Sequence, residues 1–239
     1  MKNAVLKVNL FLVLLTLCMD TQPARADTSP SLLAPVEVLT RMEERIEQQY
    51  AALDSYRARR RYSAAHPLLG DSVYLLVEEH YRTPGEKEFE VLERGGPAAI
   101  QKRLFSRLMQ AEMDTSPEEE RRAVDICRRN YQFTFQEYDA TARAYVFQVE
   151  PRTSNPYLMR GKIWVNAEDF AVQRVEGEPA KRHSFWVRRT HFVHEFGKFG
   201  DFWFPVYHHS KSKIFPFGSA TLEITYYDYD WQPHKEVLP

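Results

Sequence analysis

The sequence predicts an α+β protein: a strongly curved antiparallel β-sheet of about 9–11 strands, covered on its concave face by about three helices. Three observations predict this class. Apolar residues recur at helical spacing in only a few stretches, they alternate with polar residues in most of the rest, and turn signals separate the alternating runs at short intervals. Of the 32 aromatic residues, 24 lie after position 130, so most of the sheet is expected there.

The composition is that of a globular protein. Hydrophobic residues make up 44% and charged residues 27% of the 239 positions, which argues against a disordered or fibrous chain. The 32 basic residues nearly balance the 33 acidic ones. A chain with so little net charge has no bulk electrostatic attraction to nucleic acid, and we expect no nucleic-acid partner.

The N-terminal segment has the parts of a secretory signal peptide. Lys2 and Lys7 precede an apolar run over residues 10–17, and Ala24-Arg25-Ala26 closes the segment. The run is shorter than the about 20 residues that a membrane-spanning helix needs. We therefore predict a signal peptide over residues 1–26, cut after Ala26, and a single domain over residues 27–239 in the periplasm or outside the cell. The alternative is a buried N-terminal helix.

Cysteine usage agrees with export of a chain that has no internal disulfide. Cys18 lies in the predicted signal peptide, so Cys127 is the only thiol expected in the mature protein. Its stability must then come from an apolar core. Cys18 could instead anchor an outer-membrane lipoprotein, but Leu17 stands where a small residue usually precedes such a cysteine.

Residues 35–53 are predicted to form the first helix. Pro35 suits a first helical turn, and Asp54-Ser55 ends the pattern. The apolar face is marked by residues that recur at intervals of three and four: Leu39, Met42, Ile46, Tyr50 and Leu53.

Three strands are predicted next. Residues 56–62 alternate apolar positions with arginines, and further runs begin at Val73 and Phe89. Thr83-Pro84-Gly85-Glu86 is a plausible hairpin turn between the last two.

Two helices are predicted after these strands. Ile100, Leu104, Leu108 and Met109 mark one face of a helix that runs to about Met113. Ser116 and Pro117, followed by glutamates, form a helix start of the capping type. That second helix is expected to end near Cys127.

From Tyr131 onward the chain reads as six or seven strands. Alternation is clearest over residues 145–150, 162–166 and 221–226, and turn signals lie at 151–156, 177–179, 198–201 and 215–218. This spacing is typical of an antiparallel meander and not of βαβ units.

Candidate catalytic motifs are weak. Gly70-Asp71-Ser72-Val73 resembles the serine block of GDSL-type esterases, whose Asp-x-x-His pair lies near the C-terminus. The segment from Asp230 to His234 is one residue too long for that pair, and the alternating βα units of the class are missing. We therefore favour a turn before the Val73 strand over a hydrolase built on Ser72 and His234. No other catalytic fingerprint occurs, and we predict no enzymatic activity.

Histidines and charged clusters give no metal or cofactor site. On a strand, His191 and His194 face opposite sides, as do His208 and His209. A cross-strand pair such as His191 with His208 is conceivable, but a metal needs several converging ligands, so neither a metal nor a cofactor is expected. His183 completes this set of histidines.

Two charged clusters also occur in the sequence. Glu176 and Glu178 are interpreted as turn and rim residues, although paired carboxylates can do acid–base work. Arg57, Arg59, Arg60 and Arg61 are interpreted as a solvated strand face with Glu partners on the neighbouring strand, with phosphate binding as the alternative. Cys127 is interpreted as structural.

The order of elements resembles the LolA/LolB-like superfamily of outer-membrane lipoprotein-sorting-like periplasmic proteins. The segment from Gly161 to Gly177, which reads GKIWVNAEDFAVQRVEG, looks like the paired strands "G-x-I-x-V-x-x-x-D-x-x-I-x-R-V" of such proteins. Phe202-Trp203-Phe204-Pro205-Val206 is similar to their "x-x-W-x-P" strand. Carriers of this superfamily also use a basic residue in the cavity and particular helix and loop contacts with membrane partners.

The resemblance implies a half-barrel sheet closed by helices around an apolar cavity that receives acyl chains. The candidate lining residues are the inward-facing positions of three strands and two positions on the helical lid: Tyr145, Phe147, Val149, Ile163, Val165, Leu222, Ile224, Tyr226, Leu104 and Leu108. A solid core would use the same residue types at these positions.

The leading hypothesis is an exported, non-enzymatic carrier or binding protein for lipid or lipoprotein acyl chains, acting in outer-membrane lipoprotein or lipid sorting. The expected partners are an acyl chain and envelope membrane proteins, and a monomer is expected. The alternative is an envelope sensor or scaffold that binds a protein partner through the same fold.

Overall fold

Ten strands and three helices make up the part of the chain that the computed structural model describes, which is residues 32–67, 73–114, 116–181 and 187–234. The predicted signal peptide and Ser72 lie outside these residues. Within the described part, none of the helices combines the length and apolar character that a membrane-crossing helix needs.

The helices are α1 (Pro35–Ala52), α2 (Ala98–Asp114) and α3 (Glu118–Val124). The strands, in chain order, are β1 (Leu53–Ala65), β2 (Val73–Arg82), β3 (Glu86–Gly95), β4 (Tyr131–Asp139), β5 (Ala144–Pro151), β6 (Met159–Asn166), β7 (Val172–Pro179), β8 (Val187–Phe199), β9 (Phe202–Ile214) and β10 (Gly218–Pro233).

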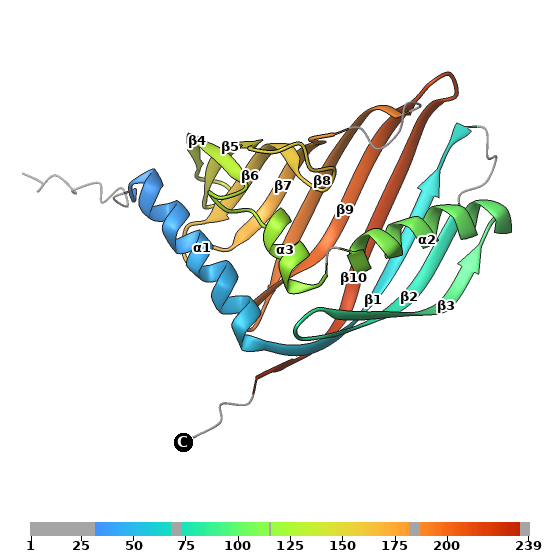
Figure 1. Cartoon of the computed structure of the whole chain (residues 1–239), viewed down its shortest axis with the longest axis horizontal. Coiled ribbons are helices and arrows are strands. Elements are labelled where there is room, and N and C mark those ends of the chain that lie inside the picture. The colour runs from blue at the N-terminus through green and yellow to red at the C-terminus, as the bar shows by residue number, and fades with distance from the viewer. Residues whose placement is uncertain (1–31, 68–72, 115, 182–186, 235–239) are drawn as a thin grey trace, which may run out of the picture. The chain divides into compact units, whose positions relative to one another are not determined.

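All ten strands belong to one antiparallel sheet, in the order β3-β2-β1-β10-β9-β8-β7-β6-β5-β4 (Figure 1). Every neighbouring pair except β1 with β10 is joined directly along the chain, as a meander predicts. The sheet is open: β3 and β4 are its two edges.

One row of residues crosses the sheet and defines its two faces. Cross-strand partners point to the same side, and the registers connect residues of eight strands from β2 to β5: Leu75, Tyr62, Ile224, His208, His194, Val175, Ile163 and Phe147. We call the face that carries this row the inner face, and the opposite one the outer face.

The helices pack on the inner face, at its two ends. Buried Val38, Leu39 and Met42 of α1 join a cluster with inner-face residues of β5, β6 and β7. Phe105 of α2 joins a second cluster with Tyr62 and its neighbours on β2 and β10. In Figure 1 all three helices lie on the same side of the sheet, with α2 over β2 and β3 and α3 between α1 and α2.

The predicted elements agree with the structure to within a few residues. The first helix ends at Ala52 because Leu53 is already extended, with φ −88° and ψ 119°, and begins β1. The third helix starts at Glu118 with Pro117 at its cap, and no side chain caps it. The predicted Ser116 cap is therefore wrong. Residues 83–85 form the expected turn, and Cys127 forms no disulfide.

Two glycines of the superfamily-like segment face each other across β6 and β7. Gly161 pairs with Gly177, and a Cβ on either would lie 2.1–2.2 Å from a backbone oxygen of the other strand. Gly161 also has φ +153°. Only glycine permits this close approach, so the motif specifies strand packing.

Candidate functional site

An apolar cavity of about 210 Å³ lies on the inner face beneath α1. Its apolar wall comes from α1, from the segment after α3 and from β7 and β8: Ile46, Val124, Ile126, Ala171, Val172 and Phe196. The remaining lining residues are polar or amphipathic: Arg45, Gln49, Tyr50, Asp125 and Trp203. A cavity of this kind accepts a greasy group and offers polar contacts at its rim.

Gln49 fixes the C-terminal turn of α1 to the sheet beside this cavity. Its side-chain amide donates to the carbonyl oxygen of Trp203 and accepts from the Trp203 backbone N–H, both at 2.9 Å. These two hydrogen bonds fix the distance between α1 and β9, and so hold the cavity wall in place.

The polar side of the cavity is set by Tyr50, Arg121 and Asp125. The Arg121 guanidinium lies 3.7 Å from the centre of the Tyr50 ring and 2.6 Å from Asp125. Burial raises the pKa of Tyr50 to about 12 and that of Asp125 to about 6, because a charge in this place is poorly solvated.

The predicted lining residues divide between the two apolar clusters. The five on β5 and β6 lie in the α1 cluster: Tyr145, Phe147, Val149, Ile163 and Val165. Leu108, Leu222, Ile224 and Tyr226 lie in the α2 cluster. Leu104 belongs to α2, but its side chain is outside the described part. None of them is among the residues that line the 210 Å³ cavity; their contact with a ligand stays a prediction.

Between the clusters the inner face is aromatic and only half-buried. Phe192, His194, Phe196 and His208 all retain some solvent contact. The ring centres of His194 and Phe196 are 4.7 Å apart, and those of Phe192 and His208 are 5.9 Å apart. Helices α1 and α2 thus cover the two ends of the inner face, and this band of aromatic rings lies between those ends.

The two histidines of this band contact each other. His194 Nδ1 lies 3.3 Å from His208 Nδ1, and His194 Nε2 has no hydrogen-bond partner among the described residues. Desolvation, together with the neighbouring His208, lowers the pKa of His194 to about 3, and desolvation together with His209 lowers that of His208 to about 4. The pairing of His191 with His208 was wrong: the register places His191 opposite Lys211.

A buried ionic cluster lies under α2 at the other end. Arg60 of β1 contacts the carboxylates of Glu79 on β2 and of Glu112 on α2, the latter at 2.5 Å. Lys87 of β3 lies 3.3 Å from Glu79 and 3.4 Å from Glu112. The Tyr56 hydroxyl donates to Glu79 at 2.9 Å. Two cations and two anions therefore balance beneath α2.

Mutual attraction keeps this cluster charged. Burial alone would raise the pKa of Glu112, but Arg60 and Lys87 outweigh burial and bring that pKa down to about 2. Burial also opposes the charge of Lys87, yet Glu79 and Glu112 raise its pKa. Such a group is costly to break, because removing one member leaves a buried charge uncompensated.

The prediction that the β1 arginines form one solvated strand face is wrong for Arg60. Arg59 does face solvent and lies 3.7 Å from Glu78 and 3.3 Å from Asp228, as predicted for a strand face with acidic partners. Arg60, the next residue, points inward and is 3% exposed. Its guanidinium lies 4.9 Å from the centre of the Tyr226 ring, which favours a buried cation.

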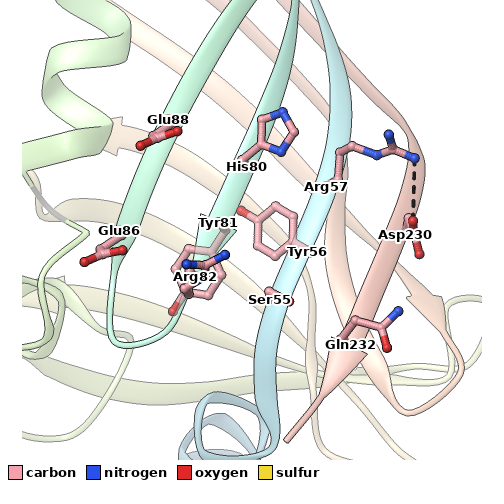
Figure 2. Close-up of a pocket in the computed structure, with 10 residues that line it drawn as sticks. All are labelled: Ser55, Tyr56, Arg57, His80, Tyr81, Arg82, Glu86, Glu88, Asp230 and Gln232. Atoms are coloured by element: carbon pink, nitrogen blue, oxygen red, sulfur yellow. Dashed lines mark ion pairs between the residues drawn. The ribbon is translucent and has the colours of Figure 1, made fainter.

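The outer face has a polar hollow of about 300 Å³ at the end where β1 meets β2 and β10 (Figure 2). Two cross-strand rows supply its charged and polar groups: Glu88, His80, Arg57 and Asp230 in one, and Glu86, Arg82, Ser55 and Gln232 in the other. Arg57 and Asp230 lie 3.5 Å apart. The charges alternate in sign, so the hollow selects no single class of ligand.

Among the described residues, Glu78, His80 and Glu90 bring three metal-ligating atoms within 4.8 Å of one another. They lie on the outer face beside this hollow, where Arg59 and His80 already contact Glu78. Sequence reasoning missed the trio because its members come from two strands and meet only in register.

The remaining candidates have structural partners. Glu176 contacts Arg174 at 2.9 Å and His191 at 3.3 Å, and Glu178 contacts Arg189. His234 lies 3.4 Å from Asp54, and Ser72 lies outside the described residues. The described residues thus assemble no nucleophile, base and oxyanion site of the kind that hydrolysis requires.

Fold and site together define a class: an open antiparallel sheet with helices on one face and an apolar cavity between them. Solved structures similar to this chain include a LolA superfamily protein from Nitrosomonas europaea, at 12% identity and a TM-score of 0.45, covering 87% of this chain and 96% of that one. Another is a DUF1329 family protein from Desulfovibrio piger, at 11% identity and a TM-score of 0.48, covering 84% and 95%. No family model and no curated protein matches the chain. The superfamily that the sequence resembles is thus also named among its structural neighbours.

Proposed function

We propose that this protein is an exported, non-enzymatic carrier that holds an acyl chain of a lipid or lipoprotein between its helices and the inner face of the sheet. One observation carries the proposal: the inner face is apolar at both ends, where helices cover it, and its middle is a band of Phe and His rings that is only half-buried. Monomeric proteins rarely leave such an aromatic surface in water without a use for it.

The energetics favour an acyl ligand. Burying a methylene group contributes about 0.8 kcal/mol, so a 16-carbon chain represents roughly 12 kcal/mol before the costs of binding. The cavity under α1, at about 210 Å³, is smaller than the about 300–1,000 Å³ of ordinary ligand sites. A whole chain would therefore extend from this cavity along the aromatic band.

The helices act as covers in this proposal, and the face they cover is the concave side of the curved sheet. Because α2 is held by Phe105 and by the ionic cluster, its displacement would widen the inner space without breaking strand pairs. The predicted lining residues Phe147, Ile163 and Ile224 would then contact the ligand.

Export belongs to the same proposal. The signal peptide over residues 1–26 would direct the chain to the periplasm, where N-terminal sequencing of the mature protein should give Asp27 as its first residue. A mature chain that begins at Cys18 and carries lipid would instead establish an outer-membrane anchor.

The direct test is ligand binding by purified, delipidated protein. We expect saturable uptake of a fluorescent fatty acid, and native mass spectrometry of protein taken from cells should detect a co-purifying lipid. Absence of both would overturn the carrier proposal.

The alternative is a protein partner bound at a sheet edge. Edge strand β4 leaves Phe135 37% exposed, and a partner strand could pair there. A stoichiometric partner that remains bound after delipidation, together with no fatty-acid uptake, would favour this alternative.

A further inference from the structure

We propose that the tip of the β9–β10 hairpin and the basic surface beside it form a docking site for an anionic phospholipid bilayer. The tip comprises residues 214–218. This surface is separate from the inner-face cavity, and the proposal does not depend on what that cavity binds.

Two aromatic side chains at the tip are about half exposed. Phe215 is 49% and Phe217 is 54% exposed, the two most exposed aromatic residues among the described large hydrophobic side chains. They flank Pro216 in the turn between two strands of 13 and 16 residues. This turn lies at the far end of β10 from Pro233, which pairs with Leu53 at the start of β1, as Figure 1 shows.

Basic side chains surround the tip. Six of them are exposed on the neighbouring ends of β6, β7, β8 and β9: Arg160, Lys181, Arg188, Arg189, Lys211 and Lys213. The excess of basic over acidic residues at this end follows from the sequence, because no Asp or Glu occurs between Pro179 and His194 or between Pro205 and Leu222. Over the whole chain, by contrast, the 32 basic residues are nearly equal in number to the 33 acidic ones.

Four of these residues line a hollow of about 300 Å³: Arg160, Lys181, Arg188 and Arg189. Glu178 is the one acidic group in its lining, and Arg189 contacts it. Arg160 donates to the carbonyl oxygen of Ala180 at 3.3 Å. Arg188 links the hollow to the tip, since its guanidinium lies 4.2 Å from the centre of the Phe215 ring.

This pairing of features fits a membrane surface better than a soluble ligand. Phe side chains can insert at the boundary between the headgroups and the acyl chains of a bilayer, and basic residues within a Debye length of anionic lipids are each attracted to them. The tip would place Phe215 and Phe217 among the headgroups while Lys211 and Lys213 contact phosphates. An acidic protein partner would satisfy the charges but would not need a projecting aromatic turn.

The test is sedimentation of the full mature chain with vesicles of phosphatidylcholine alone or mixed with phosphatidylglycerol. We expect binding to the mixed vesicles only, weakened by salt. The double variant Phe215→Ser/Phe217→Ser and the double variant Lys211→Glu/Lys213→Glu should each lower the partition coefficient about tenfold or more. Phe135→Ser, which removes an exposed aromatic residue on distant β4, is the matched control and should bind as the parent does.

Two outcomes would overturn the proposal: equal binding to both vesicle types, or tip variants that bind like the parent. Fatty-acid uptake, measured on the same variants, separates this proposal from the carrier proposal. The tip variants should take up fatty acid normally, and a protein that takes up none can still dock through the tip.

Discussion

Arg59 and Arg60 are neighbours on β1, but they contribute very differently to the stability of the fold. Arg59 is 48% exposed at the side chain and contacts Glu78 and Asp228 in water, whereas Arg60 is 3% exposed and neutralises two buried carboxylates. Ion pairs in water stabilise little. Removing one member of a buried ionic cluster strongly lowers the free energy of unfolding, because its partners stay charged in poorly solvating surroundings.

Replacing Arg60 with methionine should therefore lower the free energy of unfolding by about 3–5 kcal/mol. The matched change Arg59→Met, one residue away and on the opposite face, should cost about 0–1 kcal/mol. Chemical denaturation of both variants checks the difference. Equal losses would mean that Glu79 and Glu112 are solvated.

The histidine pair predicts sensitivity to acid. His194 and His208 have folded pKa values of about 3 and about 4, against 6.5 in an unfolded chain. The unfolded state therefore binds more protons, and stability falls as pH drops from about 6.5 toward 4, by at most about 1.4 kcal/mol per pH unit for each histidine. Asp125 acts in the opposite sense below about pH 6, because its folded pKa is raised.

His194→Gln should remove one of these titrations and flatten the dependence of unfolding free energy on pH between 6.5 and 4. Phe192→Leu, a packing change in the same aromatic band, is the control and should shift the curve without changing its slope. An unchanged slope in His194→Gln would contradict the buried, neutral state of that ring. Among the charges of the ionic cluster, Glu112 and Arg60 act on the His194 ring.

At the scale of elements, α1 and α2 are attached to the sheet in different ways. Fully buried Val38 and Met42 hold α1, and Gln49 adds two hydrogen bonds to β9. α2 depends on Phe105 and on the charge of Glu112. An attachment that relies on one ionic group is weakened by one substitution.

Glu112→Gln should therefore loosen α2 selectively. We expect faster hydrogen exchange in peptides from residues 98–114, with little change over residues 35–52. Mass spectrometry of exchanged peptides measures this directly. If both helices exchanged faster together, α2 would not be an independent cover.

The sequence predicts the positions of helices and turns better than it predicts which polar side chains are buried or paired on the inner face. Hydrophobic spacing locates α1, and Thr83–Glu86 locates a hairpin turn, because both signals are local. The burial of Arg60 could not be predicted, because the sequence shows four arginines within five positions and does not say which one is buried. The partner of His208 depends on the register of β8 against β9, which has two irregularities and cannot be read from either strand alone.

At the scale of the whole described fold, the open sheet separates three surfaces. The inner face carries an apolar row with helices at both ends, the outer face carries paired charges, and the β9–β10 end carries exposed aromatic and basic residues. This separation would let the chain hold a ligand on one surface and approach a membrane with another.

The central claim is that an acyl chain enters the cavity under α1. Val172 lines this cavity and pairs with inner-face Val165, so Val172→Trp would fill the space. Thr225→Trp adds the same side chain at an exposed outer-face position and is the control. We predict that titration of delipidated protein with a fluorescent fatty acid gives at least about tenfold weaker binding for Val172→Trp, while Thr225→Trp binds as the parent does. Equal affinity in all three proteins, or no binding by any of them, would contradict the claim.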